Sequence, residues 1–321
     1  MVNFYMQIKA KANEEQLKKK NSEKKISVKK QYWIEKHFNS NKEKNFLEKQ
    51  INPVLSRLLS SRNVEANNFE DYMNPKIKNI LPDPFILHDM EIATNKIVEI
   101  IKEKKKIGIF GDYDVDGSTS TALLSKYLRE AGVEFEFYIP DRIKEGYGPN
   151  EDAFTRLVDS NCELIITLDC GTTAFKEIDF TNKKGVDVIV IDHHKQGKEL
   201  PKAFAIVNPN KQSDNSNLVN LCAAGVTFLL LVSLNRELKK INFFQDGEPN
   251  LIFYLDLVAL GTVCDLVKID HLNRAFIKQG LRILNHSPNL GVSSILKESK
   301  IDSEVTDYHL GFIIGPRINA G

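Results

Sequence analysis

Between residues 106 and 209, short apolar runs alternate with longer segments of mixed polarity. The apolar runs have the length and continuity of strands that are buried on both faces, and the segments between them have helical spacing. Strands are predicted at 106–112, 133–140, 162–169, 186–192 and 204–209, with helices at 118–132, 151–160 and 173–185. Strands that alternate with helices form a parallel sheet with helices on both faces. The chain is therefore predicted to have an α/β fold, followed by a helical segment after residue 220.

The start of the chain has a different composition. Its first 50 residues hold thirteen Lys and six Glu but no Arg or Asp. A lysine-rich arm can contact nucleic acid, but a solvated extension is the more common role and is favoured here. Further along, Asp89 precedes an amphipathic segment and could cap a helix that begins there.

Composition also bears on the compartment. No apolar run approaches the roughly 18 residues that a membrane span needs. The N-terminus lacks the apolar core and cleavage site of a signal peptide. The four cysteines, at 162, 170, 222 and 264, form no C-x-x-C pair, so reduced thiols are expected. These features favour a soluble, cytoplasmic protein that does not contact membranes.

Acidic and imidazole side chains follow the ends of several predicted strands. They are Asp112, Asp114 and Asp116 after the first strand, Asp169 after the third, Asp192, His193 and His194 after the fourth, and Asp265 after a later apolar helix. The carboxyl ends of parallel strands meet at one edge of a sheet, so these groups are expected to lie together. Like charges at such spacing are tolerated only when a cation or strong donors neutralise them.

Each group also has a structural explanation. A single Asp at a strand end is more often a helix cap than a metal ligand. The combination of these residues favours metal ligands over helix caps, because four or more carboxylates and two imidazoles in one cleft require divalent cations. Carboxylate with imidazole and without thiolate suits Mn²⁺ or Mg²⁺ better than structural zinc. The number of carboxylates indicates two ions, an arrangement that stabilises the attacking and leaving oxygens of a phosphoryl displacement.

With DYDVDG, LDCGTT, DHH and GTVCD in this order, the chain resembles the DHH phosphoesterase family. RIKEGYGPN (142–150), IVNPN (206–210), LCAAGVTF (221–228) and GPRINAG (315–321) are similar to segments of the RecJ exonucleases within that family. The resemblance runs from about residue 80 to residue 321. It implies a single-stranded-DNA-specific 5′→3′ exonuclease of DNA repair and recombination that uses two Mn²⁺ or Mg²⁺ ions and releases nucleoside 5′-monophosphates. It also implies single-stranded DNA as a partner, with helicases or single-strand-binding proteins as further partners.

The resemblance implies roles for individual residues as well. The metal ligands of the catalytic site would be Asp114, Asp116, Asp169, His193 and Asp265. His194 would contact the scissile phosphate, Asp112 and His194 are additional candidate ligands, and Asp192 would orient an imidazole. The candidate substrate-binding residues are Arg142 and Tyr147, which resemble residues that hold the DNA strand, and Arg317 and Asn319, which resemble a phosphate-binding loop.

The chain departs from the family in two places. Phe110 stands where many relatives have a histidine, so one ion would be held more weakly or by Asp112. The chain also ends at Gly321, where RecJ proteins continue with a second catalytic lobe of the DHHA1 type and an OB fold. The expected regions are a lysine-rich and helical part over 1–80, a DHH catalytic domain over 81–300, and the start of a linker over 301–321. An exposed apolar face is expected near 305–314.

Three other functions stay open at this point. A DHH phosphoesterase of small substrates would cleave oligoribonucleotides, cyclic dinucleotides or pyrophosphate, and the EGYG segment argues against it. A non-catalytic DNA-binding fragment would be expected to lose ligands, whereas the carboxylate and His-His set is intact. A nucleotide-binding α/β protein is disfavoured, because no G-x-G-x-x-G or Walker loop follows the first strand.

Overall fold

A computed structural model describes residues 25–26, 28–33, 36–245, 247–286 and 289–320, so most of the lysine-rich arm lies outside the described residues. The chain divides into two units, residues 1–73 and 74–321. The first unit contains an antiparallel pair of short strands and four short helices around Phe46 and Leu59. They are β1 (Lys25–Ile26), β2 (Tyr32–Trp33), α2 (Ser40–Glu48), α3 (Pro53–Ser61), η1 (Ala66–Asn68) and α4 (Phe69–Met73).

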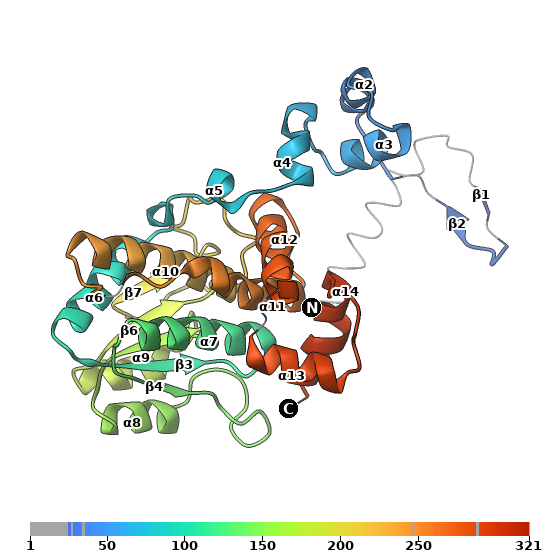
Figure 1. Ribbon diagram of the computed structural model, residues 1–321. Helices are drawn as coiled ribbons and strands as arrows, with labels where there is room; N and C mark the ends of the chain where they lie inside the picture. Colours follow the sequence, from blue (N-terminus) through green and yellow to red (C-terminus); the bar gives the residue numbers. More distant parts are fainter. Residues whose placement is uncertain (1–24, 27, 34–35, 246, 287–288, 321) are drawn as a thin grey trace. The chain divides into compact units, whose positions relative to one another are not determined.

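The second unit is built on a five-stranded sheet in which every pair of neighbouring strands is parallel (Figure 1). The strands are β3 (Lys106–Gly111), β4 (Phe135–Tyr138), β5 (Cys162–Leu168), β6 (Asp187–Ile191) and β7 (Ala205–Val207). Their order in the sheet is β4-β3-β5-β6-β7. The chain therefore reverses direction across the sheet between β3 and β5, which is the point where open α/β sheets bind ligands.

Helices cover both faces of this sheet, which confirms the predicted α/β class. One face packs on α6 (Met90–Lys102), α7 (Val115–Glu130) and α10 (Ala223–Lys240), and the other on α8 (Glu151–Asp159) and α9 (Phe175–Lys183). Ile109, Ile166 and Ile189 lie side by side on β3, β5 and β6 and are fully buried in the first layer. Phe110 faces the opposite layer, where its ring contacts Phe154.

Two local predictions need correction. The helix after the first strand begins at Val115, three residues before the predicted start at 118, because Asp114 caps it. Asp116 consequently lies in the first turn of α7 and not in a loop. Asp89 does precede α6, but its side chain makes no cap hydrogen bond to that helix. Its carboxylate instead accepts a hydrogen bond from the buried Lys211 Nζ at 2.6 Å.

The last part of the unit is helical. It contains α11 (Leu255–Cys264), α12 (His271–His286), α13 (Leu290–Glu298), α14 (Asp307–His309), the π-helical η4 (Leu310–Ile314) and α15 (Gly315–Ile318). The 3₁₀ turn η3 (Leu251–Tyr254) precedes α11. Earlier in the unit, α5 (Ile77–Ile80) and the 3₁₀ turn η2 (Pro84–Ile86) precede α6. Of the large apolar side chains in the face expected near 305–314, Tyr308 and Phe312 are exposed and their rings stack, whereas Leu310 and Ile314 are buried. Over the described residues, no helix combines the length and the apolar character that crossing a bilayer requires.

Candidate metal centre

Three aspartates continue the hydrogen-bond ladder of the sheet beyond its last strand residues. The backbone N–H of Asp112 donates to Leu168 O at 3.2 Å, that of Asp169 to Ile191 O at 3.0 Å, and that of Asp192 to Val207 O at 3.1 Å. Each aspartate is therefore held at the carboxyl end of its own strand by the neighbouring strand. This register brings the ends of β3, β5 and β6 together at the reversal point of the sheet.

The turn from β3 into α7 positions two more carboxylates. Asp114 Oδ1 accepts a hydrogen bond from the backbone N–H of Gly117 at 2.9 Å, which makes Asp114 the N-cap of α7. The buried Asp116 accepts hydrogen bonds from the backbone N–H groups of Ala223 and Ala224, at 2.6 and 2.9 Å. These two amides begin α10, where the helix dipole favours a negative charge. Asp116 thus links α7 to α10.

Asp192 orients both histidines. Its Oδ1 accepts hydrogen bonds from the backbone N–H of His193 at 2.7 Å and from His194 Nδ1 at 2.8 Å, while its Oδ2 accepts one from Thr172 N at 3.0 Å. Burial alone would raise the pKa of Asp192, but the bonds from His194 and Thr172 hold it below its usual range. The hydrogen bond to Asp192 raises the pKa of His194. Both oxygens of Asp192 are occupied, which fits its expected role of orienting an imidazole.

Seven side chains converge on one small volume. Three groups have ligand atoms within 4.8 Å of one another: Asp112, Asp114 and Asp169; Asp116, His193 and Asp265; and Asp169, His193 and His194. His193 Nε2 lies 3.2 Å from Asp169 Oδ1, 3.6 Å from Asp265 Oδ2 and 3.7 Å from Asp116 Oδ2. The structure therefore brings together every residue that the sequence suggested as a ligand.

The centre is short of hydrogen-bond partners and rich in negative charge. Both oxygens of Asp112, Oδ1 of Asp169, Oδ2 of Asp265 and Nε2 of His193 are buried without a hydrogen-bond partner among the described residues. Burial, reinforced by neighbouring carboxylates, raises the pKa of Asp112 to about 6 and that of Asp265 to about 7. Burial, then Asp116 and Asp114, raise the pKa of Asp169 well above its usual range. Unpaired buried oxygens beside one imidazole nitrogen are the donor set that a hard divalent cation takes.

These shifts predict how the metal-free protein responds to pH. A carboxyl group whose pKa is raised by folding holds a proton that the unfolded chain has released, so stability falls as the pH rises between the two pKa values. For Asp265 this window runs from about 4 to about 7. We expect Asp265→Asn to match the wild type in melting temperature near pH 4.5 and to exceed it by roughly 2–8 °C near pH 8.

Thermal unfolding in EDTA at several pH values measures this difference. Comparing the two proteins cancels the groups that lie far from Asp265. His193 lies 3.6 Å from it, and its pKa is lowered by burial, so its contribution has the opposite sign. Parallel melting curves across the whole range would contradict the prediction.

The expected substrate-binding residues lie around this centre in different ways. The Tyr147 hydroxyl lies 3.2 Å from His194 Nε2 and donates to the Asp169 carbonyl at 3.3 Å. Asn319 Oδ1 accepts a hydrogen bond from Val115 N at 3.1 Å, and the Asn319 carbonyl accepts one from the Arg142 guanidinium at 3.1 Å. Arg317 is exposed, and its guanidinium donates to Ile313 O at 2.9 Å, within its own helical segment.

Three supporting residues were not predicted. Asn208 donates to the His194 carbonyl at 2.8 Å and Asn210 to the His193 carbonyl at 2.6 Å, so this pair fixes the backbone of the two histidines. Tyr113 lies with its ring 6.3 Å from that of Tyr147 and under the Arg142 guanidinium, which is 5.2 Å from the ring centre. The asparagines flank a proline directly after β7, which is a sequence signal for a turn that uses its side chains.

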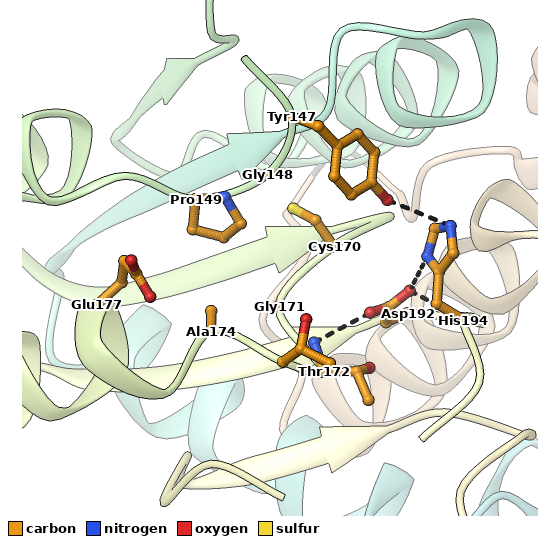
Figure 2. A pocket seen from close by; sticks show the side chains of 11 residues that line it. Tyr147, Gly148, Pro149, Cys170, Gly171, Thr172, Ala174, Glu177, Asp192 and His194 are labelled. Atoms are coloured by element: carbon orange, nitrogen blue, oxygen red, sulfur yellow. Dashed lines mark hydrogen bonds and ion pairs between the residues drawn. The ribbon is translucent and has the colours of Figure 1, made fainter. Parts of the chain in front are cut away.

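A pocket of about 310 Å³ adjoins the centre on the outer side of His194 (Figure 2). Tyr147, His194 and Asp192 form one end of it, and the turn that leads from β5 into α9 forms another wall. The Tyr147–His194 contact lies where the pocket meets the centre.

Comparison with known proteins adds to this picture. Residues 106–262 match the family model described as DHH family, N-terminal domain. The single-stranded-DNA-specific exonuclease RecJ of Bacillus subtilis is 37% identical over 272 residues, which cover 84% of this chain and 33% of that protein. RecJ of Haemophilus influenzae is 36% identical, over 84% of this chain and 47% of its own length. The chain thus spans between a third and a half of the length of these curated relatives.

Solved structures resemble the chain over a similar region. A crystal structure of exonuclease RecJ bound to manganese has a TM-score of 0.64 and 33% identity, and the match covers 73% of this chain and 57% of that one. RecJ from Thermus thermophilus in complex with Mn²⁺ has a TM-score of 0.71 and 28% identity, and the match covers 88% of this chain and 39% of that one.

Proposed function

The chain belongs to the DHH family, and on that premise we propose that it is a metal-dependent exonuclease that removes nucleotides from single-stranded DNA. The observation that carries the proposal is the convergence of buried, unpartnered carboxylate oxygens and one imidazole nitrogen at the reversal point of the sheet. Its chemistry is hydrolysis of a phosphodiester, with nucleoside 5′-monophosphates as products and 5′→3′ polarity, as the resemblance to RecJ implies.

The residues present fit two Mn²⁺ or Mg²⁺ ions. We propose that Asp116, His193 and Asp265 hold one ion, and that Asp112, Asp114 and Asp169 hold the other. Asp169 Oδ1 also lies 3.2 Å from His193 Nε2, so Asp169 would contribute to holding either ion. When bound, such ions neutralise charge on the phosphoryl oxygens and make a nearby water more acidic.

The chain's own residues would orient the substrate. Asp192 accepts from Nδ1 of His194, and Nε2 of the same ring lies 3.2 Å from the Tyr147 hydroxyl. When both ring nitrogens are protonated, Nε2 would donate to a phosphoryl oxygen in place of that hydroxyl. Arg142, which Asn319 ties to the start of α7, offers a guanidinium to the phosphates of the strand. Arg317 would have to leave the Ile313 carbonyl to do the same.

The proposal also extends to the surroundings of the reaction. We propose that the chain acts in the cytoplasm beside a helicase or a single-strand-binding protein, because those proteins work where single-stranded DNA arises.

The function is tested with labelled substrates. The chain is incubated with Mn²⁺ and a 5′-labelled single-stranded oligonucleotide, and with the matching duplex, a short oligoribonucleotide and pyrophosphate. We expect release of labelled mononucleotide from the single strand alone, and no release when EDTA replaces Mn²⁺. Faster turnover of the oligoribonucleotide or pyrophosphate would instead identify a small-substrate phosphoesterase.

Asp192 provides a prediction about positioning. We expect Asp192→Asn to lower kcat by about 10- to 100-fold, because an amide cannot accept from Thr172 N and His194 Nδ1 at the same time. The variant should also lower the pKa of the His194 imidazole, which an NMR titration measures and which a merely structural role would not change. Activity within twofold of the wild type, or an unchanged His194 titration, would contradict this role.

A further inference from the structure

The pocket beside His194 has a charge pattern that does not suit a phosphate. Its charged or ionisable lining side chains include Asp192, His194 and Glu177, and no Lys or Arg lines it. The imidazole of His194 is already bonded to Asp192. A phosphate entering this space would face the Glu177 carboxylate without a cation to balance it. This lining therefore disfavours an anionic occupant.

The remaining walls suit a flat, partly apolar group. Tyr147, Pro149 and Ala174 present a ring and aliphatic atoms, and Gly148 and Gly171 expose only backbone (Figure 2). The volume of about 310 Å³ lies at the small end of ligand pockets and admits one ring system, not a dinucleotide.

One polar group in the pocket lacks a protein partner. Glu177, in the first turn of α9, is partly buried, and its carboxylate makes no hydrogen bond or ion pair with any described residue. Figure 2 shows it at the end of the pocket opposite His194. A carboxylate that faces a pocket without a protein partner is available to a ligand. An ionised carboxylate only accepts, so the ligand must bring donors.

We propose that this pocket receives the base of the terminal nucleotide and that Glu177 binds the amino edge of that base. The proposal rests on the proposed function, since it assumes a phosphodiester at the neighbouring centre. His194 is shared by the centre and the pocket, so a strand whose phosphate meets its Nε2 can place the adjoining nucleoside on the pocket side of Tyr147. Tyr147 then contacts the base with its ring.

The four bases differ in how many hydrogen-bond donors they offer to the Glu177 carboxylate. Guanine offers two adjacent donors to a carboxylate, its ring N–H and its amino group. Cytosine and adenine each offer an amino group beside an acceptor nitrogen. Thymine offers one ring N–H between two carbonyl oxygens, which repel the carboxylate. We therefore expect terminal dG to be removed about fivefold or more faster than terminal dT, with dC and dA between them.

The experiment compares four oligonucleotides that differ only in the terminal base. The kcat/KM for release of the first nucleotide is measured for the wild type, for Glu177→Gln and for Asp179→Asn. The last variant removes a carboxylate from the same helix, at a position that does not line the pocket. Binding of deoxyguanosine and thymidine, which carry no phosphate, is measured separately by equilibrium dialysis in EDTA.

Support requires a dG preference in the wild type that disappears in Glu177→Gln and persists in Asp179→Asn. Equal rates for all four bases, or a preference that survives in Glu177→Gln, would overturn the proposal while leaving the exonuclease intact. If no substrate is cleaved, the proposed function fails, and the dialysis experiment then tests whether the pocket binds a base. Tighter binding of deoxyguanosine than of thymidine, lost in Glu177→Gln, supports it, and equal binding overturns it.

Discussion

Asp169→Asn should lower the rate of cleavage about a thousandfold, the factor that corresponds to roughly 4 kcal/mol of lost transition-state stabilisation. Of the three aspartates beside His193 Nε2, Asp169 lies closest, and its Oδ1 has no hydrogen-bond partner among the residues described. An amide neither carries the charge nor offers two oxygens to cations. The backbone should tolerate the change, because Asp169 has a φ of 63°, a conformation that asparagine adopts readily.

The same variant should be more stable than the wild type when metal is absent. Removing one of several crowded carboxylates relieves repulsion that the amides and imidazoles of the metal-free centre offset only in part. We expect the melting temperature in EDTA to rise by about 2–4 °C, the shift for about 1 kcal/mol in a chain of this size. Functional sites often store such strain, and neutralising them trades activity for stability.

Asp256→Asn is the matched control for this experiment. Asp256 is also buried, but Leu257 N and Asn289 N donate to its carboxylate at 2.7 and 3.1 Å. Replacing it should lower the melting temperature and leave cleavage unchanged. The role given to Asp169 would be wrong if the two variants behaved alike, or if Asp169→Asn retained activity in Mn²⁺.

Gly117→Ala should lower cleavage about a hundredfold, which is the effect of displacing reacting groups by about 1 Å. A Cβ on Gly117 would lie 2.4 Å from the Asp112 carbonyl oxygen and 2.8 Å from Asp112 Cα. Backbone atoms cannot rotate away as a side chain can, so the turn that carries Asp112, Asp114 and Asp116 must move. The melting temperature should fall as well, because the Gly117 N–H would leave the Asp114 cap.

Gly197→Ala is the control for the glycine effect. Gly197 lies in the loop after the two histidines, and nothing lies within 4 Å of a Cβ built there. The variant should keep wild-type activity and stability. Equal activity of both glycine variants would show that the turn from β3 into α7 tolerates displacement.

The sequence predicts the sheet and the site edge well because both depend on local patterns. Strands buried on both faces are continuous apolar runs, and the acidic residues stand directly after them. The prediction fails where a distant group decides. Asp89 precedes its helix as a cap would, yet its carboxylate accepts a hydrogen bond from Lys211 and does not cap the helix.

Supporting contacts are the least predictable part. Asn208 and Asn210 fix the two histidines across 14 and 17 residues of chain, and Tyr113 contacts Tyr147 and Arg142 from between two aspartates. Nothing in their local sequence specifies those partners. The carboxylate of Glu177 has no sequence signal at all, because its neighbours along α9 have the pattern of an ordinary exposed helix.

The most direct test of the central claim is a count of bound ions. Calorimetric titration of the metal-free chain with Mn²⁺ should give two ions per chain for the wild type and fewer for Asp169→Asn, with Asp256→Asn unchanged from the wild type. Failure of the wild type to bind Mn²⁺, or equal binding by wild type and Asp169→Asn, would contradict the claim that these carboxylates and His193 form a two-metal centre.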